Sequence, residues 1–162
     1  MFEVNEYVMY SFRGICKVAD IKDEGVTRTK KLYYILQPIK DSRSTLMTPV
    51  DSEKVPIRGI VPSEEAQKLM DSLETLEIDW IANNRLRTTT FTEIARTGEL
   101  AKTIGILLAF LRQQIILKES NKKLTLPDEK IFKIVESLVY EELGYALGMK
   151  EHDIRKKLIK VL

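Results

Sequence analysis

The hydrophobic residues of this chain change their spacing once, close to residue 62. Before this point, short runs rich in β-branched and aromatic residues alternate with glycine, proline and polar clusters, which is the pattern of strands and turns. After it, apolar residues recur every three or four positions, which is typical of amphipathic helices. The chain of 162 residues is long enough for two small domains, and the change predicts an α+β fold with domains 1–60 and 61–162.

The first 60 residues are expected to form four or five short strands. The strand-like runs are residues 4–10, 15–21, 32–36, 45–48 and 55–60. Pro38 and Pro49 end two of them because proline cannot donate a hydrogen bond to a neighbouring strand. Strands this short and this regularly spaced favour a small barrel of the SH3 or Tudor kind.

A small sheet of this kind leaves edge strands, and two interpretations of an edge are open. An exposed edge can accept a strand from a partner protein. Alternatively, charged side chains protect the edge from pairing, and four basic residues could serve this purpose: Lys30, Lys31, Lys40 and Arg43.

The remaining residues are expected to form a bundle of four or five helices. Ser63 is predicted to cap the first helix, whose apolar face would include Ala66, Leu69, Met70, Leu73 and Leu76. Later helices are expected at residues 83–96, from residue 100 past Ile115, and at 125–147 and 151–161, with a polar loop at 118–123. Thr125 is a plausible N-cap, with Asp128 completing a short capping box.

Catalytic and metal-binding patterns are lacking in the sequence. The single cysteine, Cys16, and the single histidine, His152, fall in different predicted domains, and no phosphate-binding glycine motif is present. The adjacent acids Glu141 and Glu142 are interpreted as surface charges. We therefore expect no catalytic residue, no metal and no cofactor, and a protein that is not an enzyme.

Charge and hydropathy narrow the location and the partners. The net charge is +2, so nucleic acid would have to be bound by a local patch. Two clusters could form one positive face or could simply be solvated: Arg85, Arg87 and Arg96, and Lys122, Lys123, Lys130 and Lys133. No signal peptide and no run of 18 apolar residues is evident, so we expect a cytoplasmic monomer without a membrane partner.

Trp80 is the only tryptophan, and two arginines, Arg85 and Arg87, follow it within seven residues. One interpretation is a core tryptophan that fixes two helices to each other, since large aromatic side chains dominate core energetics. The other is an exposed apolar wedge beside a phosphate-binding cluster.

Four stretches of the chain carry distinctive sequence motifs in a distinctive order. They are VNEYVMYSFRGICKV at residues 4–18, YYILQP at 33–38 followed by TLMTPVD at 45–51, DWIANNRLR at 79–87 followed by Phe91 and by TGE at 97–99, and the helical run at 124–143. Together they resemble the bacterial CarD/CdnL transcription regulators, whose N-terminal domain is shared with transcription-repair coupling factors. The chain departs from the family pattern at Asn5-Glu6, Ser11 and Arg13, and at Glu24 and Met47, where many members have basic residues.

The resemblance implies a specific mechanism. The β domain would bind the RNA polymerase β subunit through an edge strand made of Thr45, Leu46, Met47, Thr48 and Pro49. The helical domain would contact promoter DNA in the minor groove without reading its sequence, and would stabilise the open complex with Trp80 at the upstream edge of the bubble. Arg85, Arg87 and Lys130 would hold phosphates. The alternative is an adaptor that docks on polymerase without a DNA wedge.

Overall fold

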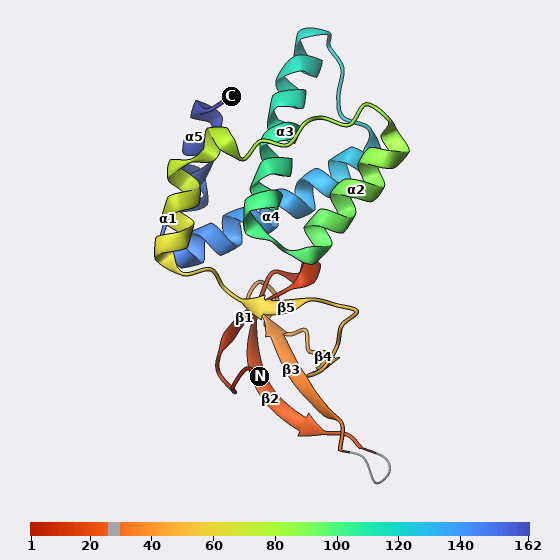
Figure 1. Cartoon of the computed structure of the whole chain (residues 1–162), viewed down its shortest axis with the longest axis vertical. Coiled ribbons are helices and arrows are strands. Elements are labelled where there is room, and N and C mark those ends of the chain that lie inside the picture. Colours follow the sequence, from red (N-terminus) through yellow and green to blue (C-terminus); the bar gives the residue numbers. More distant parts are fainter. Residues whose placement is uncertain (26–29) are drawn as a thin grey trace. The chain divides into compact units, whose positions relative to one another are not determined.

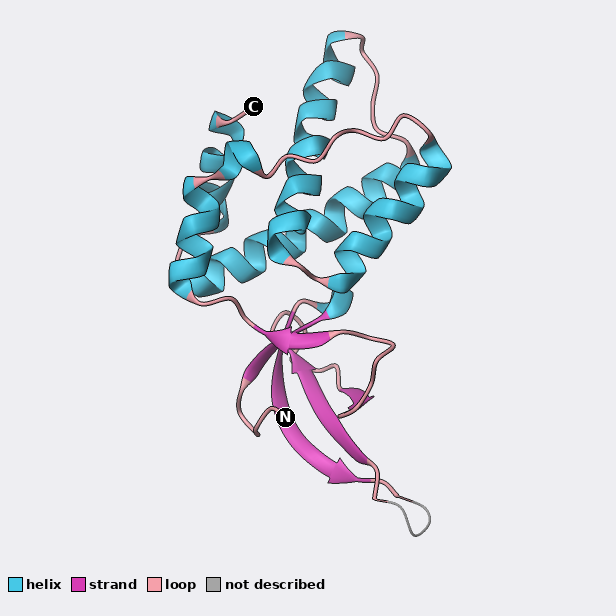
Figure 2. Cartoon of the chain, viewed as in Figure 1, coloured by secondary structure: helices cyan, strands magenta, loops and turns pink. Residues whose placement is uncertain are grey.

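The computed structural model describes residues 1–25 and 30–162, which form two compact units, Met1–Ile60 and Val61–Leu162. The described strands belong to the first unit, which also contains a short 3₁₀ helix (Ser11–Arg13), and the α-helices belong to the second, as the colours of Figure 2 show. The predicted α+β fold, with a β unit followed by a helical unit, is confirmed.

The first unit is a five-stranded antiparallel sheet. Its strands are β1 (Tyr7–Tyr10), β2 (Ile15–Asp23), β3 (Leu32–Pro38), β4 (Leu46–Pro49) and β5 (Ile57–Gly59). Their order across the sheet is β4-β3-β2-β1-β5 (Figure 1). Within the described residues β4 and β5 therefore stand at the two edges and do not pair with each other, so the sheet does not close into a complete barrel.

The core of the β unit follows from the two-residue period of its strands. Five buried side chains form this core: Val8, Cys16, Val18, Tyr34 and Leu36. The first strand starts at Tyr7 rather than at residue 4, because Asn5 adopts a positive φ of 75° that interrupts the extended backbone. A β-bulge lies between Val18 and Asp20, where the register of β2 against β3 shifts.

The second unit contains five α-helices among its described residues. They are α1 (Ser63–Asp71), α2 (Asn84–Thr97), α3 (Leu100–Glu119), α4 (Leu126–Leu147) and α5 (Glu151–Lys160). In this unit α4 packs against each of the other four helices, and α3 crosses it (Figure 1). The predicted helical bundle is therefore organised around α4.

Helix α3 supplies much of the core of this unit. Every residue from Thr103 to Leu111 is buried, so the helix is enclosed around its whole circumference over two turns. By length and composition alone it could cross a membrane, but more than half of its most apolar window is buried inside the protein. The composition is that of a core helix.

Two sequence-based assignments in the helical unit need correction. Ser63 is not the N-cap of α1, because Pro62 occupies that position and its carbonyl accepts the Ala66 N–H at 2.9 Å. Glu142 is not a surface charge, since its side chain is buried and accepts a hydrogen bond from the Val61 N–H at 3.1 Å. Thr125 does cap α4, where its hydroxyl accepts from the Asp128 N–H.

Candidate functional site

Trp80 lies in the segment between a short 3₁₀ helix (Leu73–Thr75) and α2. Its side chain is half-buried and packs against the core of the helical unit. The indole meets Phe91 edge-to-face with 6.0 Å between ring centroids, and meets Phe110 in the same way at 5.4 Å. Aromatic pairs of this geometry contribute about 0.5–1.5 kcal/mol each beyond their buried area. One part of the ring is thus fixed, and the rest reaches solvent.

Arg87 holds Trp80 from one side. Its guanidinium carbon lies 4.4 Å from the centroid of the indole ring, in a cation–π contact. The same group donates from Nε to Asp128 Oδ1 at 2.9 Å and from Nη2 to Asp128 Oδ2 at 2.6 Å. Nη1 donates to the carbonyl of Ile81 at 2.7 Å, and Nη2 to Asn84 Oδ1 at 2.9 Å. One side chain therefore connects the Trp80 segment, α2 and α4.

This network changes the role predicted for Arg87. The side chains of Arg87 and Asp128 are 3% and 2% exposed, and both ends of the pair are hydrogen-bonded inside the protein. A phosphate could reach this guanidinium only if the buried pair came apart, which would leave a carboxylate without its partner. We therefore replace the phosphate contact predicted for Arg87 with a different role: Arg87 holds the side chain of Trp80 in position.

The electrostatics of Asp128 fit this arrangement. Burial alone would raise the pKa of the carboxyl group, but hydrogen bonds from Arg87 and Thr125, together with the charge of Arg87, outweigh it. The net result is a pKa below the ordinary value. Asp128 is thus held ionised opposite Arg87, which favours the geometry that supports the indole.

A glycine lets the Trp80 segment approach α3 closely. The Ile78 N–H donates to the Gly105 carbonyl at 3.4 Å. A methyl group at Gly105 would lie 2.2 Å from the carbonyl oxygen of Leu76 and 2.8 Å from Ile78 Cγ1. The sequence analysis did not single out Gly105. A lone glycine inside an otherwise apolar helical run is the signal that could have identified it.

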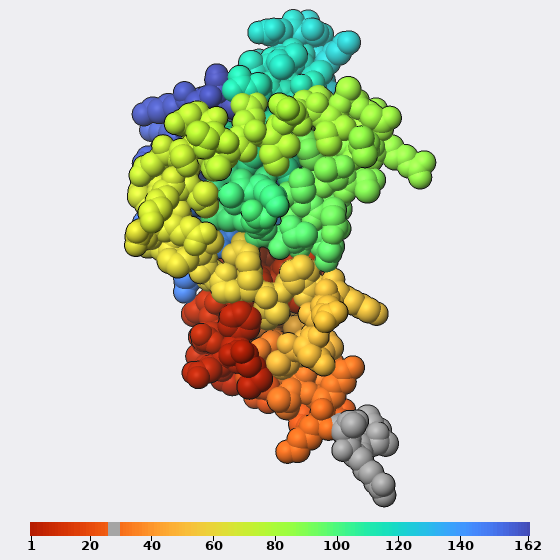
Figure 3. Space-filling model, in the orientation of Figure 1, coloured from red at the N-terminus to blue at the C-terminus, as the bar shows by residue number. Residues whose placement is uncertain are grey.

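The other predicted DNA contacts, Arg85 and Lys130, are exposed. Arg85 lies in the first turn of α2 beside Leu86, which is 57% exposed, and side chains of this light green region reach the surface in Figure 3. Arg96, the third arginine near Trp80, instead pairs with Glu93 at 2.6 Å, and its hydrogen bond is the main cause of the lowered pKa of that glutamate. Arg85 and Lys130 thus remain available to a phosphate.

A small hollow of about 180 Å³ adjoins Trp80. Its lining includes Asp79 from the Trp80 segment and Gln113 and Arg112 from α3. The sequence did not indicate Arg112, whose guanidinium is held by Glu77 at 2.5 and 2.9 Å. The hollow therefore carries a paired rather than a free positive charge.

The predicted docking strand is β4 at one edge of the sheet. Thr45 and Met47 are exposed, Leu46 and Pro49 are half-buried, and Thr48 is buried. The Val50 N–H donates to Leu32 of β3 at 3.0 Å, and hydrogen bonding alternates along an antiparallel strand. The amide of Met47 therefore faces away from β3, whereas Pro49, two residues on, has no N–H to offer. Met47 provides a central donor of this free edge.

Comparison with known proteins identifies only the first unit. Residues 2–61 match the family model of the CarD-like/TRCF RID domain, an RNA polymerase-interacting domain. The matched range coincides with the β unit and ends where the helical unit begins. No curated protein matches the chain.

Proposed function

We propose that this chain, whose β unit is a CarD-like/TRCF RID domain, is a non-enzymatic transcription regulator that stabilises the promoter open complex. The β unit would bind the β subunit of RNA polymerase, and the helical unit would contact promoter DNA with Trp80 at the upstream edge of the bubble. The family match of residues 2–61 is the observation that carries the polymerase-binding part. The DNA-contacting part is supported by the partly exposed ring of Trp80 and by the exposed side chains of Arg85 and Lys130.

The free edge of β4 supports docking by strand addition. An added strand gains affinity from main-chain hydrogen bonds and specificity from alternate side chains. Met47, at 52% exposure, presents both its amide and its side chain away from the core. Because the hydrogen bonds come from the backbone, such docking does not need a basic residue at this position.

The support around Trp80 favours a wedge that is fixed before DNA arrives. Phe91, Phe110 and Arg87 restrain the ring, so little conformational entropy would be lost when its exposed part meets DNA. Unstacking a base step of the DNA costs about a few kcal/mol, and an indole that packs against the unstacked bases would offset this cost. The low net charge of +2 is compatible with this role, because tethering to polymerase supplies a high local concentration.

One observation favours the second candidate, an adaptor that docks on polymerase without a wedge. Trp80 belongs to the same aromatic cluster as the fully buried Phe91 and Phe110. A structural tryptophan would make the same contacts. The two candidates differ in what happens to the open complex when the indole is removed.

Replacing Met47 by proline should abolish capture of RNA polymerase, whereas Met47→Ala should retain most of it. Proline removes the amide that faces away from β3, and it does not disturb the pairing of β4 with β3, in which that amide takes no part. The measurement is pull-down of purified polymerase by the two variants, with circular dichroism to check the fold. Equal capture by Met47→Pro and the parent would show that docking does not use this edge.

Trp80→Ala should reduce the open-complex half-life to that of polymerase without the protein. A loss of about 1.4 kcal/mol of open-complex stabilisation already corresponds to a tenfold shorter half-life. The half-life is measured after a competitor challenge, and polymerase pull-down should be unchanged because docking uses the other unit. Tyr145→Ala, at a half-exposed aromatic residue of α4, is the matched control and should behave like the parent.

Trp80→Phe separates the two candidates further. Phenylalanine keeps much of the packing against Phe91 and Phe110 but presents a smaller apolar surface, so we expect a partial effect on half-life in a folded protein. If Trp80→Ala is folded and lengthens the half-life as much as the parent does, the wedge is wrong and the adaptor is the better description.

A further inference from the structure

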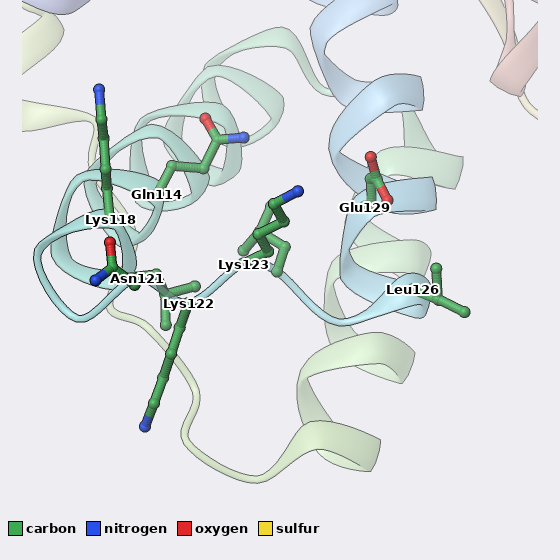
Figure 4. A pocket seen from close by; sticks show the side chains of 9 residues that line it. Gln114, Lys118, Asn121, Lys122, Lys123, Leu126 and Glu129 are labelled. Carbon is green, nitrogen blue, oxygen red and sulfur yellow. The ribbon is translucent and has the colours of Figure 1, made fainter.

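A hollow on the surface of the helical unit lies apart from Trp80. It has a volume of about 660 Å³ and lies at the loop that joins the end of α3 to the start of α4 (Figure 4). Its lining comprises Gln114, Leu117, Lys118, Asn121, Lys122, Lys123, Leu124, Leu126 and Glu129. We call this feature the lysine hollow.

The wall of the lysine hollow is an ordered turn. The Lys122 N–H donates to the Leu117 carbonyl at 2.8 Å, and the Asn121 N–H donates to the Lys118 carbonyl at 3.1 Å. Asn121 takes a positive φ of 53°, a conformation that asparagine tolerates better than most residues. These bonds set the positions from which the lysine side chains leave the backbone.

The hollow carries an excess of positive charge. Lys118, Lys122 and Lys123 are all exposed, and none of them enters an ion pair described in the structure. The single acid in the lining, Glu129, lies 3.6 Å from Lys133 of the next helical turn, which partly offsets its charge. An anionic occupant would therefore find three ammonium groups and little repulsion.

The directions of the lysine side chains decide between a compact and an extended anion. In Figure 4 Lys118 and Lys122 extend away from each other, and Lys123 lies between the loop and α4. Ammonium groups that diverge in this way do not converge on one phosphate, but they can follow a chain of phosphates. The three lysines are exposed, so they could also contact the sugar-phosphate backbone of a nucleic acid that passes over the protein surface.

We propose that the lysine hollow binds the phosphate backbone of duplex DNA and extends the DNA contact beyond Trp80, Arg85 and Lys130. This inference rests on the proposed function, because both place promoter DNA on the helical unit. The link between the two surfaces is the start of α4, where Asp128 joins Arg87 while Leu126 and Glu129 line the hollow. The hollow contributes affinity that depends on salt and not on sequence.

The experiment compares the full-length parent with the triple variant Lys118→Gln, Lys122→Gln and Lys123→Gln. Fluorescence anisotropy of a labelled duplex is measured from low to moderate salt. Each phosphate contact contributes about 0.9 to the slope of log affinity against log salt concentration, so the slope should become shallower by about 2–3. The matched control removes three exposed lysines from α5, which does not line the hollow: Lys156→Gln, Lys157→Gln and Lys160→Gln.

The outcomes separate this inference from the proposed function. If the hollow variant keeps the salt slope of the parent, or if the α5 variant changes it equally, the hollow does not bind DNA, whatever Trp80→Ala does to the open complex. If a nucleoside triphosphate competes with the duplex at the hollow as well as unlabelled duplex does, the site takes a compact anion and the inference is overturned. A parent protein that fails to lengthen the open-complex half-life contradicts the proposed function, while the duplex titration still tests the hollow.

Discussion

Asp128→Ala should destabilise the helical unit by about 3–5 kcal/mol, because it removes one partner of a buried ion pair and leaves the other charge in place. Arg87 would lose both carboxylate hydrogen bonds while its guanidinium stayed enclosed. Urea titration followed by tryptophan fluorescence measures the effect, since Trp80 is the only tryptophan and lies in this unit. The midpoint should fall by more than about 1 M, given typical urea dependences of about 1–3 kcal/mol per molar.

A neighbouring acid provides the control for Asp128. Glu129 lies in the same first turn of α4 but is exposed, and its contact with Lys133 is an ordinary surface pair. Glu129→Ala should therefore change stability by less than about 1 kcal/mol. Asp128→Asn keeps the shape and one acceptor, so its loss should lie between these two. Equal midpoints for Asp128→Ala and Glu129→Ala would show that the buried pair contributes nothing.

The same pair predicts how stability responds to acid. The pKa of Asp128 is lower in the folded protein than its ordinary value, so the ionised form stabilises the fold above that value. This contribution is lost as the pH falls below about 4 and through the folded pKa. The urea midpoint of the parent should therefore fall more steeply between about pH 5 and about pH 3 than that of Asp128→Asn, because the asparagine variant has no carboxyl group to protonate at this position.

The fate of the predicted site shows what residue patterns can and cannot indicate. Local rules predicted the Thr125 cap correctly, since a cap involves residues three positions apart. The position of Arg87 depends on Asp128, 41 residues further along the chain, and no local rule indicates that pairing. An arginine seven residues after a tryptophan can be an exposed phosphate contact or a buried side chain that holds the tryptophan in position. In the folded chain Arg87 is the buried side chain.

Secondary structure followed the hydrophobic period more closely than local propensity. The three threonines at 88–90 lower helix propensity, yet α2 continues from Asn84 to Thr97 because Phe91 and Ala95 are buried in the core. Closure of the sheet was less predictable. Strand positions could be read from proline and glycine, but which strands remain at the edges depends on pairings between segments distant in the sequence.

Gly105→Ala should displace the Trp80 segment and lower the stability of the helical unit by about 1–3 kcal/mol. Alanine gains about 1 kcal/mol over glycine in helix propensity, but the new methyl group would lie 2.2 Å from the backbone oxygen of Leu76. A backbone atom cannot turn aside as the end of a flexible side chain can. The segment must therefore move away from α3 and carry Trp80 with it.

Two other glycines make the Gly105 prediction specific. A methyl group at Gly59 meets nothing within 4 Å, and one at Gly144 lies 3.1 Å from the carbonyl oxygen of Met149. Gly59→Ala should leave the tryptophan emission unchanged, and Gly144→Ala should have a smaller effect on stability than Gly105→Ala. The variants are compared by emission maximum, urea midpoint and open-complex half-life. If Gly105→Ala keeps the parent's emission and half-life, close approach of this segment to α3 is not what holds Trp80 in position.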